Sequence, residues 1–352
     1  MATSRQKQRD PESAGASALG SRIAFFGAGT LVARELRSLL DSRGFPALSV
    51  KLFDAEREGS LGEYDGEALI TTVPDRDTIV DLDIAFMCGS IADTTRYIRW
   101  PEQRGFVAVD LSGASRSRKE VPVIHTEINP DLLSPGPSVV AAPHPVAHNL
   151  ATLVAAARGA APVSRAEVLA LRPVSDMGDK AIDELYRQTV ALLNFSEAPT
   201  EVFGRQMAFN VLPSSGMIGD RIEEFDAGMA EEAARILGME TCALRVTSAF
   251  VPVFHGHSLS VTLTFDRPVT SGEITERLAS TPGVRHVEDP SRFSPAELVG
   301  EEDVAVLGPT IDARRPERAG FWVFCDNLKG GAALNVVRIA ERLVELRRES
   351  AP

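Results

Sequence analysis

The sequence predicts an α/β protein with an N-terminal Rossmann-type parallel sheet and a second α+β domain. Three observations support this fold class. The chain has 352 residues, and at roughly 100 to 200 residues per domain that length favours two domains. Up to Pro143, apolar runs of strand length alternate with helical patterns, and after it the rhythm changes. Apolar residues make up 44% and charged residues 24% of the chain, which is typical of a globular protein.

The first half of the chain is expected to form a parallel sheet with helices on both faces. Residues 1–20 contain almost no large apolar side chains, and we expect a disordered tail there. The elements predicted after it are, in order, the strand RIAFFG, a helix over 31–40, the strands LSVKLF and DIAFMC, a helix over 91–100, and the strands FVAVDL and SVVAAP.

The second half mixes helices with strands. Helical patterns occupy 146–157, 179–193 and 224–237, and the strand-like stretches are RAEVLAL, ALRVTSAFVPVF, SLSVTLTF and GFWVFC. The alternation over 258–265 has a period of two residues, which suits a sheet with one half-covered face. From 331 to 347, large aliphatic residues recur at helical spacing among Arg and Glu, which predicts an amphipathic closing helix.

The charge of the chain argues against nucleic acid and membranes as partners. Lys and Arg total 37 and Asp and Glu total 49, a formal net charge of -12, and a surface that negative repels phosphate groups. No apolar run approaches the roughly 18 residues of a membrane span, and residues 1–20 lack the order of a signal peptide, so we predict a cytoplasmic protein. The cysteines Cys88, Cys242 and Cys325 show no CxxC spacing and are predicted to be buried thiols.

A glycine-rich turn follows the first predicted strand. Gly27 and Gly29 stand where a Rossmann-type sheet holds a pyrophosphate against glycine amides and a helix N-terminus, with Thr30 at the start of that helix. Asp54 ends the next strand, where it would accept hydrogen bonds from an adenosine ribose. These four residues are the candidate cofactor site. Val32 replaces the third glycine of the motif, so a purely structural turn is the alternative, and any dinucleotide is expected to bind weakly.

Six segments, in order, resemble aspartate-semialdehyde dehydrogenases: GAGTLVARELRSLL, VDLSGASR, VAAPHP, FNVLP, VPVFHGHS and NLKGGAALNVVRIAERL. The resemblance implies a nucleotide-binding domain over 21–143, joined by a C-terminal helix over 331–350 that returns to it, and a catalytic-type and dimerisation domain over 144–330. It also implies a homodimer, for which the strands 245–254 and 258–265 are the expected interface.

This family reduces an acyl phosphate to an aldehyde through a thioester, which requires a thiolate nucleophile, an acid or base, and cationic groups. His257 matches the catalytic histidine of the family, and Arg116 matches an arginine associated with the substrate phosphate. The nucleophile position, however, holds Pro145. Phe250 replaces a substrate-binding arginine and is expected to make that site apolar. Arg172 stands at a glutamine position and is a second candidate for substrate binding.

These departures predict a family member that kept the fold and the dimer but lost thioester chemistry. It would act as a binding or assembly protein for a small-molecule ligand or nucleotide. The alternative is an active semialdehyde dehydrogenase with a nucleophile elsewhere in the chain.

A metal site is a third hypothesis. His144 and His148 stand four residues apart at a helix start, near His257 in the family frame, with His255 as a fourth candidate ligand. Because no acidic residue is adjacent in sequence to orient them, we predict no metal and two exposed imidazoles at the helix start.

The nucleotide preference depends on two residues. Asp54 would repel a 2′-phosphate and favours NAD, whereas Arg57 would pair with that phosphate and favours NADP, the cofactor that the family resemblance implies. We expect NAD to bind slightly more tightly.

Overall fold

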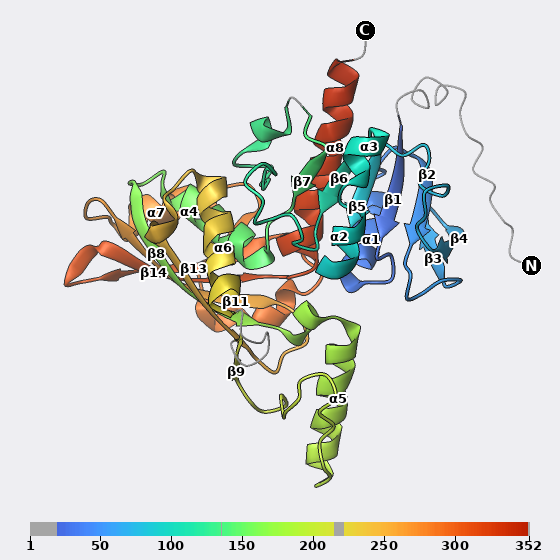
Figure 1. The fold of residues 1–352 in the computed structure, drawn as a ribbon. Helices are drawn as coiled ribbons and strands as arrows, with labels where there is room; N and C mark the ends of the chain where they lie inside the picture. Colours follow the sequence, from blue (N-terminus) through green and yellow to red (C-terminus); the bar gives the residue numbers. More distant parts are fainter. Residues whose placement is uncertain (1–19, 135, 215–221, 351–352) are drawn as a thin grey trace, which may run out of the picture.

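The computed structural model describes residues 20–134, 136–214 and 222–350. The tail predicted at residues 1–20 therefore lies, except for Gly20, outside the described residues. Two seven-stranded sheets form two lobes, and helix α5 projects away from the second lobe (Figure 1). The predicted fold class is confirmed, with a mostly parallel Rossmann-type sheet in the first half and a mixed sheet in the second.

The first sheet has the order β3-β4-β2-β1-β5-β6-β7. Its central strands pair in parallel, as their continuous apolar runs predict. They are β1 (Ser21–Phe26), β2 (Ala47–Phe53), β5 (Ile84–Met87), β6 (Val107–Asp110) and β7 (Val139–Ala141). The antiparallel hairpin of β3 (Leu61–Tyr64) and β4 (Glu67–Thr72) is not among the predicted elements. Its turn residues Asp65 and Gly66 both have positive φ, 50° and 73°, which Asp-Gly favours in hairpins.

Helices cover both faces of this sheet. They are α1 (Leu31–Ser42), α2 (Ile91–Tyr97), α3 (Trp100–Arg104) and the C-terminal α8 (Leu334–Glu349). α1 and α8 pack side by side around the buried rings of Phe25 and Phe86, so the C-terminal helix returns to the first lobe as expected (Figure 1). Two short helices replace the single one predicted over 91–100: α2 ends at Tyr97, and α3 begins at Trp100 with Pro101 in its first turn, where the missing N–H of proline costs no helical hydrogen bond.

The second sheet has the order β12-β13-β14-β11-β8-β10-β9. Its strands are β8 (Val163–Arg172), β9 (Leu212–Pro213), β10 (Leu244–Phe250), β11 (His257–Phe265), β12 (Val284–Val287), β13 (Val304–Asp312) and β14 (Arg315–Cys325). β9, β12 and β13 are not among the predicted elements. β10 ends at Phe250, earlier than the predicted stretch 243–254, and Pro252 just beyond it lacks the N–H that a strand needs.

Helices α4 (Pro145–Ala157), α6 (Ile222–Leu237) and α7 (Ser271–Ala279) pack on one face of the second sheet, while α5 (Asp179–Leu193) stands apart from it (Figure 1). The predicted bounds of α5 agree with the structure, and α7 is not among the predicted elements. The domain boundaries at 143/144 and 330/331 stay predictions. None of the described helices is long and apolar enough to cross a membrane.

The other face of the second sheet is exposed over β8, β10 and β11, whereas Phe293 and Leu298 cover it at Ala305 and Phe324 on β13 and β14. In β11 the apolar residues are all buried against the helices, so this strand presents Ser258, Ser260 and Thr262 to the open face. The apolar side chains exposed on the sheet belong instead to neighbouring strands, Leu169 on β8 and Trp322 on β14. The expected interface strand 258–265 therefore offers a polar surface, because its apolar side forms the core.

Candidate functional site

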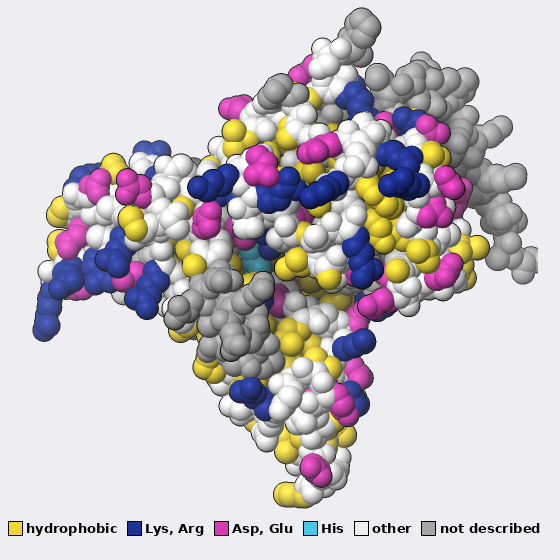
Figure 2. All heavy atoms as spheres, viewed as in Figure 1, with side chains coloured by type: hydrophobic (Ala, Val, Ile, Leu, Met, Phe, Trp, Pro, Cys, Tyr) yellow, Lys and Arg dark blue, Asp and Glu magenta, His cyan; other side chains and the backbone are white. Residues whose placement is uncertain are grey.

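A cleft of about 550 Å³ lies between the two lobes. On the Rossmann side it is lined by the segments that follow β1, β5 and β6, at the carboxyl edge where parallel sheets bind ligands. The second lobe contributes Arg172 and Asp176, and the start of α4 contributes His144 and Pro145. A histidine side chain is visible in a hollow between the lobes in Figure 2.

A buried carboxylate, Asp176, organises the second-lobe side of the cleft. It stands in a short 3-10 helix (Val174–Met177) directly after β8. Its Oδ2 accepts a hydrogen bond from Arg172 Nε at 2.8 Å and lies 2.9 Å from His257 Nε2. Its Oδ1 accepts a hydrogen bond from Asn327 Nδ2 at 2.9 Å. Burial alone would raise the pKa of Asp176, but His257 and Arg172 outweigh burial and hold that pKa well below its usual range.

His257 lies behind this carboxylate. The histidine is 1% exposed and does not line the cleft, whereas Asp176 and Arg172 do. Since an ionised carboxylate only accepts hydrogen bonds, the Nε2 atom of His257 carries a proton that points to Asp176. Its Nδ1 atom is buried and has no partner among the described residues. The predicted acid or base is therefore present but turned toward a neighbouring side chain.

Arg172 and Phe250 are register partners on the adjacent strands β8 and β10. The guanidinium carbon of Arg172 lies 4.5 Å from the ring centre of Phe250 and 4.8 Å from that of Phe225 on α6. The expectation that Phe250 makes this site apolar is wrong, because Arg172 places a cation one strand away, against the same ring. The Nη1 atom of Arg172 is buried and has no partner among the described residues.

Arg116 reaches the opposite side of the cleft. It donates from Nε to the carbonyl of Ala142 and from Nη2 to the carbonyl of Leu111, both at 2.8 Å. Glu232 on α6 lies 3.9 Å from it and also accepts the backbone N–H of His144 at 2.6 Å. Burial raises the pKa of Glu232, although Arg116 opposes the shift. Neither Glu232 nor Asp176 was among the predicted site residues, because no local pattern distinguishes them from surface carboxylates.

His144 caps the N-terminus of α4 beside the cleft. Its Nδ1 accepts the backbone N–H of Val146 at 3.1 Å. Burial, followed by the nearby Arg172, lowers the pKa of His144 well below its usual value, so the ring is neutral. A neutral ring whose Nδ1 accepts must carry its proton on Nε2. His144 is therefore fixed as a hydrogen-bond donor.

The four histidines considered for a metal site do not come together. His144 and His257 have ring centres 5.9 Å apart. His148 instead stacks on His125 at 4.1 Å, and burial lowers the pKa of His148 to about 4. The prediction of two exposed imidazoles is wrong, since both faces of α4 are covered and His144 and His148 are buried. His255 is half-buried and does not line the cleft. Within the described ranges, no group of three or more His, Cys, Asp or Glu could hold a metal ion.

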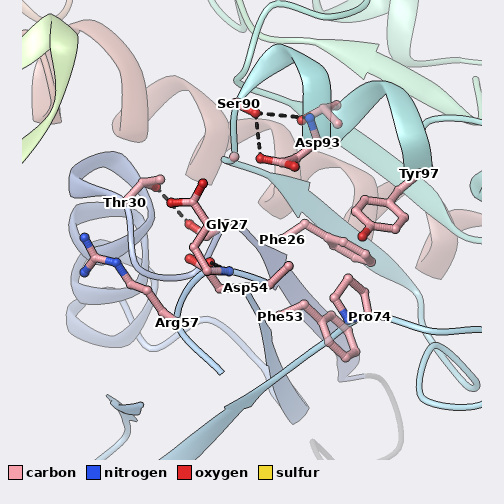
Figure 3. A pocket seen from close by; sticks show the side chains of 14 residues that line it. Phe26, Gly27, Thr30, Phe53, Asp54, Arg57, Pro74, Ser90, Asp93 and Tyr97 are labelled. Atoms are coloured by element: carbon pink, nitrogen blue, oxygen red, sulfur yellow. Dashed lines mark hydrogen bonds between the residues drawn. The ribbon is translucent and has the colours of Figure 1, made fainter. Parts of the chain in front are cut away.

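The glycine-rich turn borders a second, smaller cavity of about 210 Å³ (Figure 3). Gly27 has a φ of 75°, and a Cβ there would lie 2.4 Å from the backbone of Gly89, so only glycine fits. The N–H of Gly29 donates to Asp54 Oδ2 at 3.1 Å, and Thr30 caps α1 by accepting the N–H of Ala33. The predicted cofactor residues Gly27, Gly29, Thr30 and Asp54 are thus brought together around one turn.

Aromatic and apolar side chains form the other wall of this cavity. Figure 3 shows Phe53, Pro74 and Tyr97 opposite Thr30 and Asp54. Val32, at the third position of the glycine motif, packs at the edge of the core between α1 and β1. The helix accommodates this side chain, so the missing glycine does not disrupt the turn.

Comparisons with known proteins agree with this architecture. Residues 22–135 match the sequence profile described as semialdehyde dehydrogenase, NAD binding domain, and residues 153–329 match the profile described as semialdehyde dehydrogenase, dimerisation domain. The chain is 32% identical over 334 residues to an aspartate-semialdehyde dehydrogenase of Rickettsia conorii, covering 92% of this chain and 97% of that protein. The chain belongs to the aspartate-semialdehyde dehydrogenase family.

Two further relatives support the assignment to the aspartate-semialdehyde dehydrogenase family. A Synechocystis protein of that name is 30% identical over 329 residues, with 92% of this chain and 97% of that protein covered. The crystal structure of aspartate semialdehyde dehydrogenase II from Vibrio cholerae matches with a TM-score of 0.86 and 25% identity, covering 93% of this chain and 99% of that one.

Position 145 and the three cysteines have different surroundings in this family member. Pro145 is the first residue of α4, a position that suits proline because its missing N–H would have no helical partner. Cys88 lines the cleft but is 4% exposed, and burial raises its pKa. Cys325 pairs in register with His257, yet burial raises its pKa too, and its Sγ lies 2.6 Å from Asn149 Nδ2. Cys242 is exposed, so the prediction of a buried thiol is wrong for this residue.

The buried histidines should make the protein lose stability in mild acid. Burial lowers the pKa values of His125, His144 and His148 below the value of about 6.5 that an unfolded chain has. As the pH falls, these histidines take up protons in the unfolded chain before they do so in the folded protein. Their contribution to the free energy of unfolding is therefore fully present above about pH 6.5 and is lost progressively below it. For His148 alone, with a pKa of about 4, the loss amounts to roughly 3 kcal/mol. Urea titrations between about pH 7.5 and pH 4.5 measure this decline.

A His148→Leu variant isolates one of these contributions. Its stability should depend less steeply on pH, because one buried titrating group is gone. Burial raises the pKa of Glu232, so as the pH falls this residue takes up its proton in the folded protein before it does so in the unfolded chain. It therefore opposes the loss of stability, and it does so equally in the parent and in the variant. Equal slopes in the parent and the variant would show that His148 is not neutral in the fold.

Removing the buried carboxylate should destabilise the fold strongly. Asp176→Asn leaves the guanidinium of Arg172 buried without a counter-charge, which is expected to lower the free energy of unfolding by roughly 3 to 5 kcal/mol. Asp183→Asn is the matched control, since Asp183 pairs with Arg187 on an exposed helix surface at 2.8 Å. It should cost under about 1 kcal/mol. Similar losses in both variants, measured by urea denaturation, would contradict this account of Asp176.

Proposed function

We propose that this protein is a dinucleotide-binding, dimeric member of the aspartate-semialdehyde dehydrogenase family that forms no thioester and acts as a binding or assembly protein. The observation that carries the proposal is that the described residues of the cleft offer no accessible thiol. Position 145 holds proline, and the one thiol among the described cleft residues is the buried Cys88.

Thioester formation begins with attack by a thiolate on the substrate carbonyl. Burial raises the pKa of Cys88, with Arg37 only partly opposing it, so this sulfur stays a protonated thiol at neutral pH. Cys325 is shielded in the same way and does not line the cleft. No covalent bond to the substrate is expected to form.

The acid–base position supports the same proposal. A catalytic histidine must reach the proton that it transfers, directly or through one water. Here the Nε2 atom of His257 is engaged by Asp176, and the side chain is enclosed. The histidine stabilises a buried carboxylate and does not face a ligand in the cleft.

The polar groups that do face the cleft suit a small anionic ligand held without covalent chemistry. Arg172 and Arg116 line opposite sides, and His144 offers its Nε2 proton between them. Guanidinium groups and a neutral imidazole donor bind carboxylate or phosphate oxygens. The sequence candidates Arg116 and Arg172 are thus proposed to bind the ligand.

A dinucleotide fits the turn after β1. Gly27 keeps the backbone close to Gly89, and the first turn of α1, with Leu31 and Val32 beside the cleft, leaves N–H groups free for a pyrophosphate. Asp54 would accept from ribose hydroxyls. When bound, NAD or NADP supplies a hydride acceptor or donor. We propose NAD as the preferred form, with weak binding.

An active enzyme is the second candidate, because the relatives found here bear the name of the enzyme. It would need Cys88 or Cys325 to become exposed and deprotonated. Iodoacetamide inactivation of a phosphate-dependent NAD(P) reduction with aspartate semialdehyde tests this candidate directly. A cytoplasmic location stays a prediction from the sequence.

A homodimer is proposed through the open side of the second lobe. Tyr186, Val190 and Leu193 form an exposed apolar stripe at helical spacing on α5, with exposures of 60%, 41% and 67%. Leu169 and Trp322 add apolar surface on the open sheet face. Exposed apolar side chains of this kind are typical of subunit interfaces. The match of residues 153–329 to a dimerisation domain makes a second copy of the chain its expected occupant.

We expect no aspartate-semialdehyde dehydrogenase activity from the purified protein, and none from Pro145→Cys. The restored thiol would face a histidine still bonded to Asp176 and an anchoring arginine displaced from 250 to 172, and such misplacement costs orders of magnitude in rate. Turnover is measured as phosphate-dependent NAD(P) reduction. Turnover above background by the parent would overturn the proposal, and turnover by the variant alone would show that the rest of the site is intact.

The dimer prediction concerns α5. Sedimentation velocity at micromolar concentration should show a dimer, and Tyr186→Glu combined with Leu193→Glu should convert it to a monomer by placing charge in an apolar contact. Arg187→Gln, on the same helix but outside the stripe, should leave the dimer intact. A parent protein that sediments as a monomer would be evidence against this interface.

A further inference from the structure

The nucleotide-binding turn is tied to the second lobe by one carboxylate. Asp179, the first residue of α5, accepts hydrogen bonds from Arg34 Nη2 at 2.6 Å and from Arg57 Nη2 at 3.3 Å. Arg34 belongs to α1 and Arg57 follows β2, so both arginines come from the first lobe. The two guanidinium groups thus share one acceptor across the boundary between the lobes.

Arg57 also forms part of the cavity beside the glycine-rich turn. Its side chain lies against Gly29, where a Cβ would stand only 2.2 Å from Arg57 Cδ. In Figure 3 the guanidinium extends away from the wall that contains Phe53 and Tyr97. Its Nη2 is directed to Asp179, so the one Lys or Arg among the described residues lining the cavity is already paired.

Asp54 places a fixed negative charge in the same cavity. Its Oδ2 accepts the N–H of Gly29 at 3.1 Å, and its Oδ1 accepts the N–H of Glu56 at 3.0 Å. Both oxygens are held by backbone, so the carboxylate cannot swing away from an incoming group. A 2′-phosphate on the adenosine ribose would be repelled here unless an arginine neutralised it.

We propose that Asp179 determines the nucleotide preference of this protein by withholding Arg57 from the ribose end of the cavity. With Arg57 paired to Asp179, the charge of Asp54 dominates and NAD binds better than NADP. A 2′-phosphate must draw Arg57 off Asp179, which leaves Arg34 as the remaining partner of that carboxylate. Asp179 is a positioning residue, since it acts through Arg57. The inference rests on the dinucleotide binding proposed above.

The expected effect is moderate, because all three side chains are partly exposed, by 46% for Arg34, 47% for Arg57 and 37% for Asp179. Ion pairs at such exposure are weak. Asp179→Asn should therefore raise the affinity for NADP by about threefold to tenfold and leave the affinity for NAD within about twofold of the parent.

Calorimetric titration with NAD and NADP tests the proposal on the full chain. Asp183→Asn is the matched control, because it removes one carboxylate from the same helix but from a pair with Arg187 that does not touch the cavity. The double variant Asp179→Asn with Arg57→Gln should lose the gain in NADP affinity, since the gain is carried by Arg57. Thermal unfolding of each variant confirms that the lobes are folded.

The outcomes separate this inference from the proposed function. If NAD binds the parent but Asp179→Asn leaves the ratio of NADP to NAD affinity unchanged, Asp179 has no such role and dinucleotide binding stands. An equal gain in Asp183→Asn would reveal a general effect of net charge and overturn the role of Asp179. No heat with either nucleotide in any variant would overturn dinucleotide binding and this inference together. ADP and adenosine 2′,5′-bisphosphate lack the nicotinamide half of the dinucleotide, so titration with them measures binding at the adenosine end alone.

Discussion

Burying the carboxylate of Asp176 requires positive charge and hydrogen-bond donors around it, and the second lobe supplies them from three separate elements. An ionised group in a low-dielectric interior is strongly unfavourable unless it is paired. Arg172 comes from the end of β8, His257 from the start of β11, and Asn327 from the segment that leads into α8. The three chain segments that form this side of the cleft therefore meet at the carboxylate of Asp176. Their hydrogen bonds to it fix the shape of this side of the cleft.

His257 and Arg172 are both paired with Asp176, and this pairing is why we propose that the site binds a ligand without reacting with it. A histidine that transfers protons needs a free nitrogen facing the ligand, and here the Nε2 atom of His257 is committed to Asp176 and the ring does not line the cleft. The guanidinium of Arg172 is held by the same carboxylate and by the rings of Phe225 and Phe250. Groups fixed in this way are well suited to hold an anion in one place, because little ordering entropy remains to be lost.

The spacing of apolar residues was enough to predict most of the helices and strands. It failed where contacts between distant segments determine the surroundings of a residue. The parallel strands and the helices α4, α5, α6 and α8 follow from apolar spacing, and the Asp65-Gly66 pair marks a hairpin that the prediction overlooked. The role of Asp176 had no local signal, since its partner His257 lies 81 positions away. Phe250 considered alone suggested an apolar pocket, and only the register of β8 against β10 shows that the guanidinium of Arg172 lies against its ring. Likewise, His148 reads as a surface residue until His125 is seen to stack on it.

Several polar contacts that cross between the lobes lie beside the two cavities. Glu232 of the second lobe lies 3.9 Å from Arg116 of the first lobe beside the cleft, and Arg235 on the same helix donates to the backbone carbonyls of Arg116 and Val121. Asp179 bonds to the arginines beside the glycine-rich turn and begins α5, the helix that carries the exposed apolar stripe. A ligand in either cavity therefore meets side chains that also set how the lobes are joined. For a protein proposed to bind rather than to react, the proposed nucleotide site and the proposed dimer surface thus meet on one helix, because Asp179 is the first residue of α5.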